Sequence, residues 1–259
     1  IFASLLETGS PTWLYVSDRL VQFPMGIFAI AIGTVLLPTL SKLDVSKEKL
    51  TFINSIKKGQ KFVLFIGIPS LIGLMFCAED LISTIFYRGA FTELDVVKSS
   101  YSLIAFSFGL PFFMLMKVLT PAFFARKDTK TPMYVAIISL FLNASLNYLL
   151  AFTFGLGHVG IAIGSSIAAL VSVIILEAIL YKDGFLKMNG IFNKFNLMIL
   201  LSSAALVAFL YIYTSWINFM ELNQIKRVFF LLIEITISIA IYFSISRLVF
   251  NRPLKQMFD

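Results

Sequence analysis

The chain is dominated by apolar stretches that are long enough to cross a lipid bilayer. A transmembrane helix needs about 20 mostly apolar residues, and residues 13–41 contain only two charged side chains, Asp18 and Arg19. Charged loops and a Gly-rich break divide the rest of the chain, so we predict seven spans, with residues 1–6 as the end of an earlier helix. The predicted spans are residues 13–41, 62–78, 101–124, 132–154, 159–181, 195–216 and 228–248.

Composition excludes the soluble classes and most kinds of enzyme. Hydrophobic residues fill 59% of the 259 positions and charged residues 14%, whereas a soluble domain carries about 25% charged residues. The single cysteine, Cys77, excludes an internal disulfide, and the single histidine, His158, excludes the usual zinc catalytic sets. The sequence contains no catalytic triad or phosphate-binding loop. Because the chain starts without Met or a basic leader, we expect a fragment that lacks an N-terminal part.

Basic residues gather in alternate loops. The net charge is +7, and most of the 21 Lys and Arg residues follow the first, third, fifth and seventh predicted spans. Short loops rich in Lys and Arg stay in the cytoplasm, so the pattern predicts a cytoplasmic C-terminus and no nucleic-acid partner. The loops on the other side are mainly acidic: they contain Glu7, Glu79, Asp80, Glu93, Asp95 and Glu221, with Arg88, Lys226 and Arg227 as exceptions. Within this side, the segment LISTIFYRGAFTELD is expected to form a short surface helix that ends at Gly89.

Arg19 is the most costly side chain in the predicted spans, because an ionisable group in hydrocarbon is expensive. Positions 19, 22, 26, 29 and 33 share one helix face and hold Arg, Gln, Gly, Ala and Gly. Such a stripe is typical of a cavity wall or a close helix contact. Asp18 points about 100° away, so we do not expect it to pair with Arg19. We expect Arg19 to face a cavity, where its forked donors suit phosphate or carboxylate. The alternative is an interfacial anchor.

Other polar side chains inside the spans leave two interpretations open. Lys117 lies about two helical turns inside the membrane from Arg126, and a cavity role and snorkelling explain it equally well. Asn143 and Asn147 are spaced i, i+4, so their amides either hydrogen-bond between helices, which we favour, or help to hold Na⁺. Glu234 is expected to make an interface contact.

Three segments resemble the MurJ (MviN) family of lipid II flippases. The residues WLYVSDRLVQFPMGIFAIAIGTVLLPTLSK fit the family pattern of Asp-Arg-Leu, Pro-x-Gly and Gly-Thr-x-Leu-Leu-Pro-x-Leu-Ser. KVLTPAFFARKDTKTP and LNASLNYLL…GHVGIAIGSSI are similar to later family segments, and the likeness extends to about Tyr181, then more loosely onward. The matching residues of the first segment are Asp18, Arg19, Leu20, Pro24, Gly26, Gly33, Thr34, Leu36, Leu37, Pro38, Leu40 and Ser41.

The resemblance implies an all-α integral membrane protein with a MATE-like fold of the MOP superfamily. Such proteins have two six-helix lobes around a cavity that opens alternately to each side, and this family adds two C-terminal helices associated with a groove for the lipid tail. On that template, residues 1–181 are the C-terminal lobe, and residues 182–259 are the two added helices and a short cytoplasmic tail. The N-terminal lobe is missing.

The resemblance also implies a transporter, not an enzyme, that works without a cofactor. It would move lipid II, the undecaprenyl-pyrophosphate-linked peptidoglycan precursor, from the cytoplasmic to the periplasmic leaflet of the bacterial inner membrane. Expected partners are lipid II, membrane lipids and cell-wall synthesis or division proteins. The residues implied for the cavity are Arg19, Asp18, Gln22 and Lys117, and those implied for helix bending are Pro24, Gly26, Gly33 and Pro38.

Ion coupling stays open at this stage. Asn143, Asn147 and Ser165 match the region that forms a sodium site in some family members, so coupling to Na⁺ or to the membrane potential is an expectation. Gln22 stands where many members have Glu, and Asn147 is neutral where an acid can occur, which weakens both roles. Two other functions also remain: a MATE-type or polysaccharide exporter, which would favour an acidic cavity, and a non-transporting scaffold, for which Arg19→Ala would be harmless.

Overall fold

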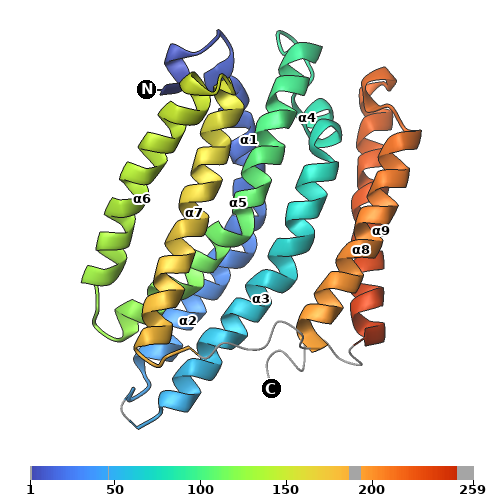
Figure 1. Ribbon diagram of the computed structural model, residues 1–259. Helices are drawn as coiled ribbons and strands as arrows, with labels where there is room; N and C mark the ends of the chain where they lie inside the picture. The colour runs from blue at the N-terminus through green and yellow to red at the C-terminus, as the bar shows by residue number, and fades with distance from the viewer. Residues whose placement is uncertain (1, 46, 187–193, 250–259) are drawn as a thin grey trace.

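The computed structural model describes all residues except 1, 46, 187–193 and 250–259. The described part is helical and contains no strand. Seven of its helical segments are long and apolar enough to cross a membrane, and they stand side by side in one bundle (Figure 1). The prediction of an all-helical chain with seven spans is confirmed. The predicted C-terminal tail lies outside the described residues.

The first half of the bundle begins with the short 3₁₀ helix η1 (Phe2–Leu5) and a long, interrupted span. This span comprises α1 (Ser10–Pro24), the π-helix η2 (Met25–Ile30) and α2 (Ala31–Ser41). The following elements are α3 (Lys49–Phe76), the short α4 (Ala78–Phe86) and α5 (Glu93–Ala125). Of residues 1–6, predicted as the end of an earlier helix, Phe2–Leu5 form this 3₁₀ helix.

The second half consists of two helix pairs. The first pair is α6 (Lys130–Tyr148), which ends in the π-helix η3 (Leu149–Thr153), and α7 (Gly157–Lys182). The second pair is α8 (Lys194–Trp216) and α9 (Gln224–Val249), joined through the 3₁₀ helix η4 (Phe219–Glu221). Gly155 and Gly157 have positive φ, of 68° and 55°, so the Gly-rich break predicted from the sequence does turn the chain between α6 and α7.

Two predictions about helix limits are wrong. The second span starts at Lys49, not at residue 62, because its added turns bury Phe52, Ile53 and Ile56. The predicted surface helix is also misplaced: α4 ends at Phe86, before Gly89, and buries one of its faces. From Glu93 onward the chain already belongs to α5, whose start is fixed by a capping box between Thr92 and Asp95.

The core centres on α5. In its most apolar stretch 61% of the residues are buried, which is the largest share among the seven spans. It packs against α1, α2, α3, α4 and α7. The α8–α9 pair lies at one side of the bundle (Figure 1) and has a separate apolar core with α3, formed by Phe65, Met198, Leu206, Leu210 and Tyr242 among others.

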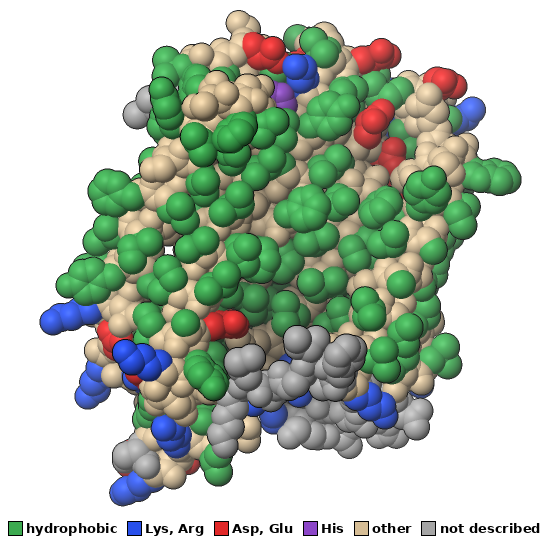
Figure 2. Space-filling model, in the orientation of Figure 1, with side chains coloured by type: hydrophobic (Ala, Val, Ile, Leu, Met, Phe, Trp, Pro, Cys, Tyr) green, Lys and Arg blue, Asp and Glu red, His purple; other side chains and the backbone are tan. Residues whose placement is uncertain are grey.

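The outer surface has the character of a membrane protein. On α6, Leu140, Phe141 and Tyr148 are 66%, 68% and 60% exposed, which suits hydrocarbon and not water. Figure 2 shows hydrophobic side chains over most of the visible face, with Lys and Arg gathered at the lower end and several acidic residues at the upper end. The chain is therefore a multi-pass membrane protein with a charge difference between its two ends.

Candidate functional site

Arg19 lies on the exposed side of α1, inside the first span. Its guanidinium stacks over the ring of Tyr15, one turn earlier, with 4.8 Å between the guanidinium carbon and the ring centroid. No carboxylate in the described part of the chain forms an ion pair with Arg19. Its donors therefore remain available for an anion from outside the chain.

Asp18 and Gln22 form a pair beside Arg19. Gln22 Nε2 donates a hydrogen bond to Asp18 Oδ2 across one helical turn. The sequence places Gln22 on the face of Arg19, but its amide turns toward Asp18 instead. Asp18 and Arg19 are not bonded to each other, as their positions on the helix predict. The Asp18 carboxylate is thus held by a neutral partner.

The stripe that runs from Arg19 to Gly33 has two different halves. Gly26 is exposed, and a Cβ at that position would meet nothing within 4 Å. Ala29 is fully buried, and a Cβ at Gly33 would lie 3.1 Å from the backbone oxygen of Lys117 on α5. The half near Arg19 is therefore open, and the half near Gly33 is a close helix contact. The close helix contact expected of the stripe is present at Gly33, and the cavity wall expected near Arg19 stays a prediction.

Lys117 is exposed on α5, next to the lower half of the stripe. Gly33 follows Arg19 by 14 positions, so Lys117 lies about 21 Å from the level of Arg19 along the bundle, at 1.5 Å per residue. The structure does not bring Arg19 and Lys117 into one pocket. They are two separate cationic positions on the exposed side of the first span and its neighbour.

The helix that carries Arg19 changes its geometry directly after Pro24. The segment Met25–Ile30, which includes Gly26, is a π-helix, and such wide turns are rare and occur mostly at functional sites. Pro24 removes one backbone donor and Gly26 tolerates irregular backbone, which explains the change at this place. Pro38, in contrast, lies within the regular helix α2.

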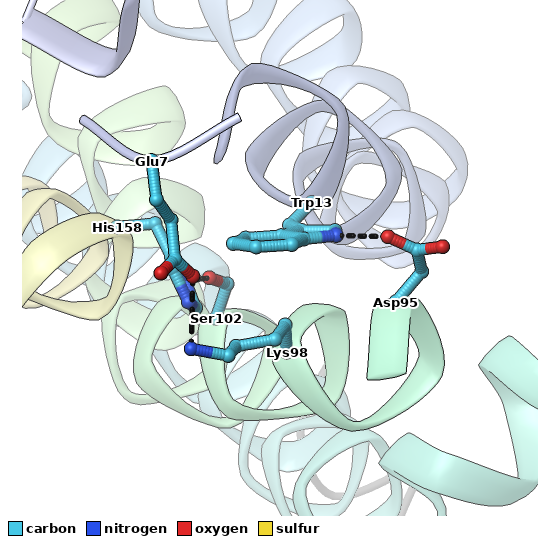
Figure 3. Close-up of polar contacts among 6 residues, drawn as sticks. All are labelled: Glu7, Trp13, Asp95, Lys98, Ser102 and His158. Carbon is cyan, nitrogen blue, oxygen red and sulfur yellow. Dashed lines mark hydrogen bonds and ion pairs between the residues drawn. The ribbon is translucent and has the colours of Figure 1, made fainter. Parts of the chain in front are cut away.

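A polar network at the upper end of the bundle fixes the start of α1 (Figure 3). Trp13 Nε1 donates to Asp95 Oδ1 at 2.7 Å, and its ring meets the His158 ring edge-on at 4.8 Å. Lys98 Nζ pairs with Glu7 Oε1 at 2.8 Å. The His158 Nδ1 atom lies 2.6 Å from the Ser102 hydroxyl.

Sequence reasoning missed this network. Its residues come from three separate parts of the chain, namely residues 7–13, α5 and α7, and the signals in the sequence were an aromatic and a histidine near span ends. The network anchors α1 to α5 and α7, so it sets the position of Arg19 two turns further along.

Asn143, Asn147 and Ser165 are neighbours between α6 and α7. Asn143 Nδ2 donates to Ser165 Oγ at 3.1 Å, and Asn147 Nδ2 donates to Asn143 Oδ1 at 2.9 Å. The bond from Asn143 to Ser165 joins α6 to α7, which is the kind of contact that the favoured interpretation expects, whereas the bond from Asn147 to Asn143 lies within α6. The three side chains supply neutral oxygens only. In the described part of the chain, no group of three or more His, Cys, Asp or Glu side chains could hold a metal ion.

Tight packing surrounds this trio. A Cβ at Gly160 would lie 2.7 Å from the carbonyl carbon of Leu150, and one at Gly164 would clash with Asn147 Oδ1. Ser166 Oγ donates across to the backbone oxygen of Ala105 at 2.8 Å. The small residues Gly160, Gly164 and Ser166 therefore permit close contacts of α7 with its neighbours.

An apolar groove of about 900 Å³ opens between α3, α5 and α7. No residue of α8 or α9 contributes to it, although the added helices were expected to be associated with a groove. Its lining includes Leu64, Ile68, Tyr101, Phe108, Phe112 and Ile163. Such a surface can hold hydrocarbon and offers almost no polar partner.

Comparisons with known proteins agree on one family. A family model described as "Lipid II flippase MurJ" matches residues 1–236. The probable lipid II flippase MurJ of Vibrio cholerae is 44% identical over 182 residues, which cover 70% of this chain and 34% of that protein. The protein of the same description in Haemophilus influenzae is 37% identical over 249 residues, which cover 93% of this chain and 48% of that protein.

A solved structure of a lipid II flippase MurJ in an inward closed conformation also resembles the chain. The TM-score is 0.78 at 29% identity, and the match covers 98% of this chain and 50% of the other. The chain thus spans half or less of the length of these related proteins.

Proposed function

The chain belongs to the lipid II flippase MurJ family, and we propose that it takes part in moving lipid II from the cytoplasmic to the periplasmic leaflet of the bacterial inner membrane. The observation that carries the proposal is the family match over residues 1–236, which includes a charged arginine exposed on a membrane-spanning helix. A flippase must shield a diphosphate and sugars from hydrocarbon, where unpaired charge is very costly.

In this proposal Arg19 binds the diphosphate. Its guanidinium is exposed, is held in place by the Tyr15 ring and has no carboxylate partner among the described residues. Guanidinium stays charged in a low dielectric and binds phosphate oxygens through two parallel hydrogen bonds. The Asp18–Gln22 pair beside it would contact neutral groups of the substrate, since Asp18 already accepts from Gln22.

Lys117 would contact the same diphosphate at a different stage of transport. It lies about 21 Å below Arg19 along the bundle, toward the end where Lys and Arg gather (Figure 2). Under the orientation predicted from the loops, that end is cytoplasmic, as is the C-terminus. Two cationic positions at different depths would let an anion pass between them without losing all of its counter-charge.

Alternating access would bend the first span at its irregular segment. Pro24, Gly26 and the π-helix Met25–Ile30 form the natural hinge, because irregular backbone absorbs dihedral changes more easily than a regular helix. Gly33 would act as a pivot against α5, and Pro38 would add a smaller bend below it.

The proposal includes the MATE-like architecture. Residues 1–181 would form the C-terminal lobe, facing an N-terminal lobe of the complete protein, and residues 182–259 would form the added helices and tail. The separate core of α8 and α9 supports this division. We assign the groove between α3, α5 and α7 to hydrocarbon, either the polyprenyl tail or membrane lipid. Cell-wall synthesis or division proteins remain proposed partners.

Energy coupling would come from Na⁺ or from the membrane potential. Asn143, Asn147 and Ser165 offer two amide oxygens and one hydroxyl oxygen, which are suitable donors for Na⁺ but carry no negative charge. The fit is therefore partial, and a sodium site would need a further ligand beyond this trio.

The experiment that tests the function uses cells depleted of their own lipid II flippase. We expect the full-length protein to restore lipid II in the outer leaflet, measured by its accessibility to a membrane-impermeant reagent. Restored drug export without lipid II translocation would favour the exporter alternative. Normal membrane levels with neither activity would favour the scaffold.

A further inference from the structure

Two buried acids meet where α9 packs against the junction of α3 and α4. Glu234 lies in the third turn of α9 and is fully buried. Its Oε1 atom accepts a hydrogen bond from the thiol of Cys77 at 3.1 Å, and its Oε2 atom is buried without a hydrogen-bond partner. The interface contact predicted for Glu234 is present, but it satisfies only half of the carboxyl group.

Asp80 is the second acid, on the opposite side of this interface. It stands in the first turn of α4, is 7% exposed, and its Oδ2 atom is also buried without a partner. It lines a polar cavity of about 290 Å³ between α4 and the end of α8. Glu79, Ser215 and Asn218, which are exposed, also line this cavity, so water can reach Asp80 from that end of the bundle.

Among the described residues, no positive charge forms an ion pair with either acid. The titratable groups around them are Glu79 on α4, Cys77 at the junction, Tyr213 on α8 and Arg227 on α9. Arg227 donates to the backbone oxygens of Phe219, Met220 and Ser83 at 2.8, 2.9 and 3.4 Å, and it stacks on the Tyr87 ring at 4.7 Å. The Tyr213 hydroxyl donates to the backbone oxygen of Phe230 at 2.8 Å. Within the described residues, neither acid forms an ion pair.

Two unpaired carboxylates in such a place are unfavourable when both are ionised. Burial, together with the charges of Glu234 and Glu79, raises the pKa of Asp80 to about 8. Burial likewise raises the pKa of the Cys77 thiol, so the thiol offers a hydrogen atom and no charge. Binding a proton removes one negative charge and gives an unpartnered oxygen a hydrogen to donate.

We propose that Asp80 and Glu234 form a proton-binding site that fastens the α8–α9 pair to α4 and exchanges its proton through the polar cavity. With a proton bound, one of the two negative charges is removed, and the carboxyl groups no longer repel each other across the interface. Without it, like charges face each other from opposite helices, and that end of the interface opens. The site is separate from Arg19 and does not depend on lipid II transport.

Opening is confined to the α4 end of the interface. At the other end, the buried Tyr242 donates its hydroxyl to the backbone oxygen of Phe65 at 2.9 Å, and no carboxyl group takes part in this bond. The apolar core of α3, α8 and α9 surrounds this bond. The α8–α9 pair is therefore expected to pivot about its lower half.

Cys77 reports on opening directly, because its buried thiol touches Glu234 and is reached only when the α4 end separates. The full-length protein in detergent is titrated from about pH 6 to pH 9 with N-ethylmaleimide, and labelling at Cys77 is followed by peptide mass spectrometry. Because thiol ionisation also depends on pH, each rate is divided by that of the double variant Asp80→Asn, Glu234→Gln, which keeps Cys77.

We expect this ratio to rise about tenfold per pH unit below the pKa of the site and to level off above it, since opening follows the deprotonated fraction. Glu79→Gln, which changes an exposed neighbour, should keep a rising profile. A ratio that stays flat with pH would overturn the proposal. Protection of Cys77 by added Na⁺ at fixed alkaline pH would also overturn it, because the site would then hold a metal ion and not a proton.

A second measurement remains if the double variant does not fold. The infrared spectrum of the native protein at about pH 7 is expected to contain a carbonyl band of a protonated carboxyl group that the single variant Glu234→Gln or Asp80→Asn weakens. Identical bands in the native protein and in both single variants would contradict a protonated pair.

Discussion

Replacing Gly160 by alanine tests the close contact that holds α7 against η3. A Cβ at this position would lie 2.7, 2.8 and 2.9 Å from three backbone atoms of Leu150 and Ala151. Backbone atoms cannot turn aside as a flexible side chain can, so the two helices must move apart. Overpacking of this kind costs about 1–3 kcal/mol, and the better helix propensity of alanine returns about 1 kcal/mol at most. We therefore expect a net loss of roughly 1–2 kcal/mol in the free energy of unfolding.

The matched control is Gly73→Ala in α3, where a Cβ would meet nothing within 4 Å. This variant should be neutral or slightly more stable, because it gains helix propensity without a clash. Thermal unfolding of both variants in the same detergent measures the difference. A Tm lower by roughly 2–8 °C for Gly160→Ala, with no loss for Gly73→Ala, is expected. Equal Tm values would refute the reasoning that backbone contact at Gly160 is tight.

Three further predictions concern the anchor, the buried acid and the arginine. Trp13→Phe loses the hydrogen bond to Asp95 and should lower stability by about 1 kcal/mol in thermal unfolding, whereas Trp216→Phe, at an 85% exposed position, should change nothing. A pKa of Asp80 raised to about 8 means that the folded protein holds a proton that the unfolded chain releases. The contribution of this proton to the free energy of unfolding should thus be full below about pH 4 and be lost as the pH rises through about 8. The Tm of Asp80→Asn should fall less than that of the native protein over this range, and a steeper fall in the variant would contradict this. Arg19→Lys keeps the charge but loses the fork, so translocation should drop about tenfold at unchanged membrane level; full activity would show that charge alone suffices.

Much of the fold could be predicted from the sequence, because hydrocarbon imposes a length on apolar helices and the loops between them are charged. The seven spans and the turn at Gly155 and Gly157 follow from this rule alone. The start of α3 at Lys49 could not be predicted in this way, since its added turns bury their apolar face against protein and not against lipid.

The candidate site was predictable only in part. Helical spacing placed Asn143 next to Asn147 and kept Asp18 apart from Arg19. The pairing of Trp13 with Asp95 joins residues that are 82 positions apart, and no local pattern contains that information. The proximity of Glu234 to Asp80 could not be predicted for the same reason, because two acids on distant helices come near each other only once the chain has folded.

The measurement that tests the central claim most directly is lipid II translocation by full-length protein that carries Arg19→Ala. Cells depleted of their own flippase would express this variant, the native protein or the control Gly73→Ala at matched membrane levels, and lipid II in the outer leaflet would be quantified. We predict that Arg19→Ala abolishes translocation while Gly73→Ala retains it, because only the first removes the cation that binds the diphosphate. Unimpaired translocation by Arg19→Ala would contradict the account and leave Arg19 as an interfacial anchor.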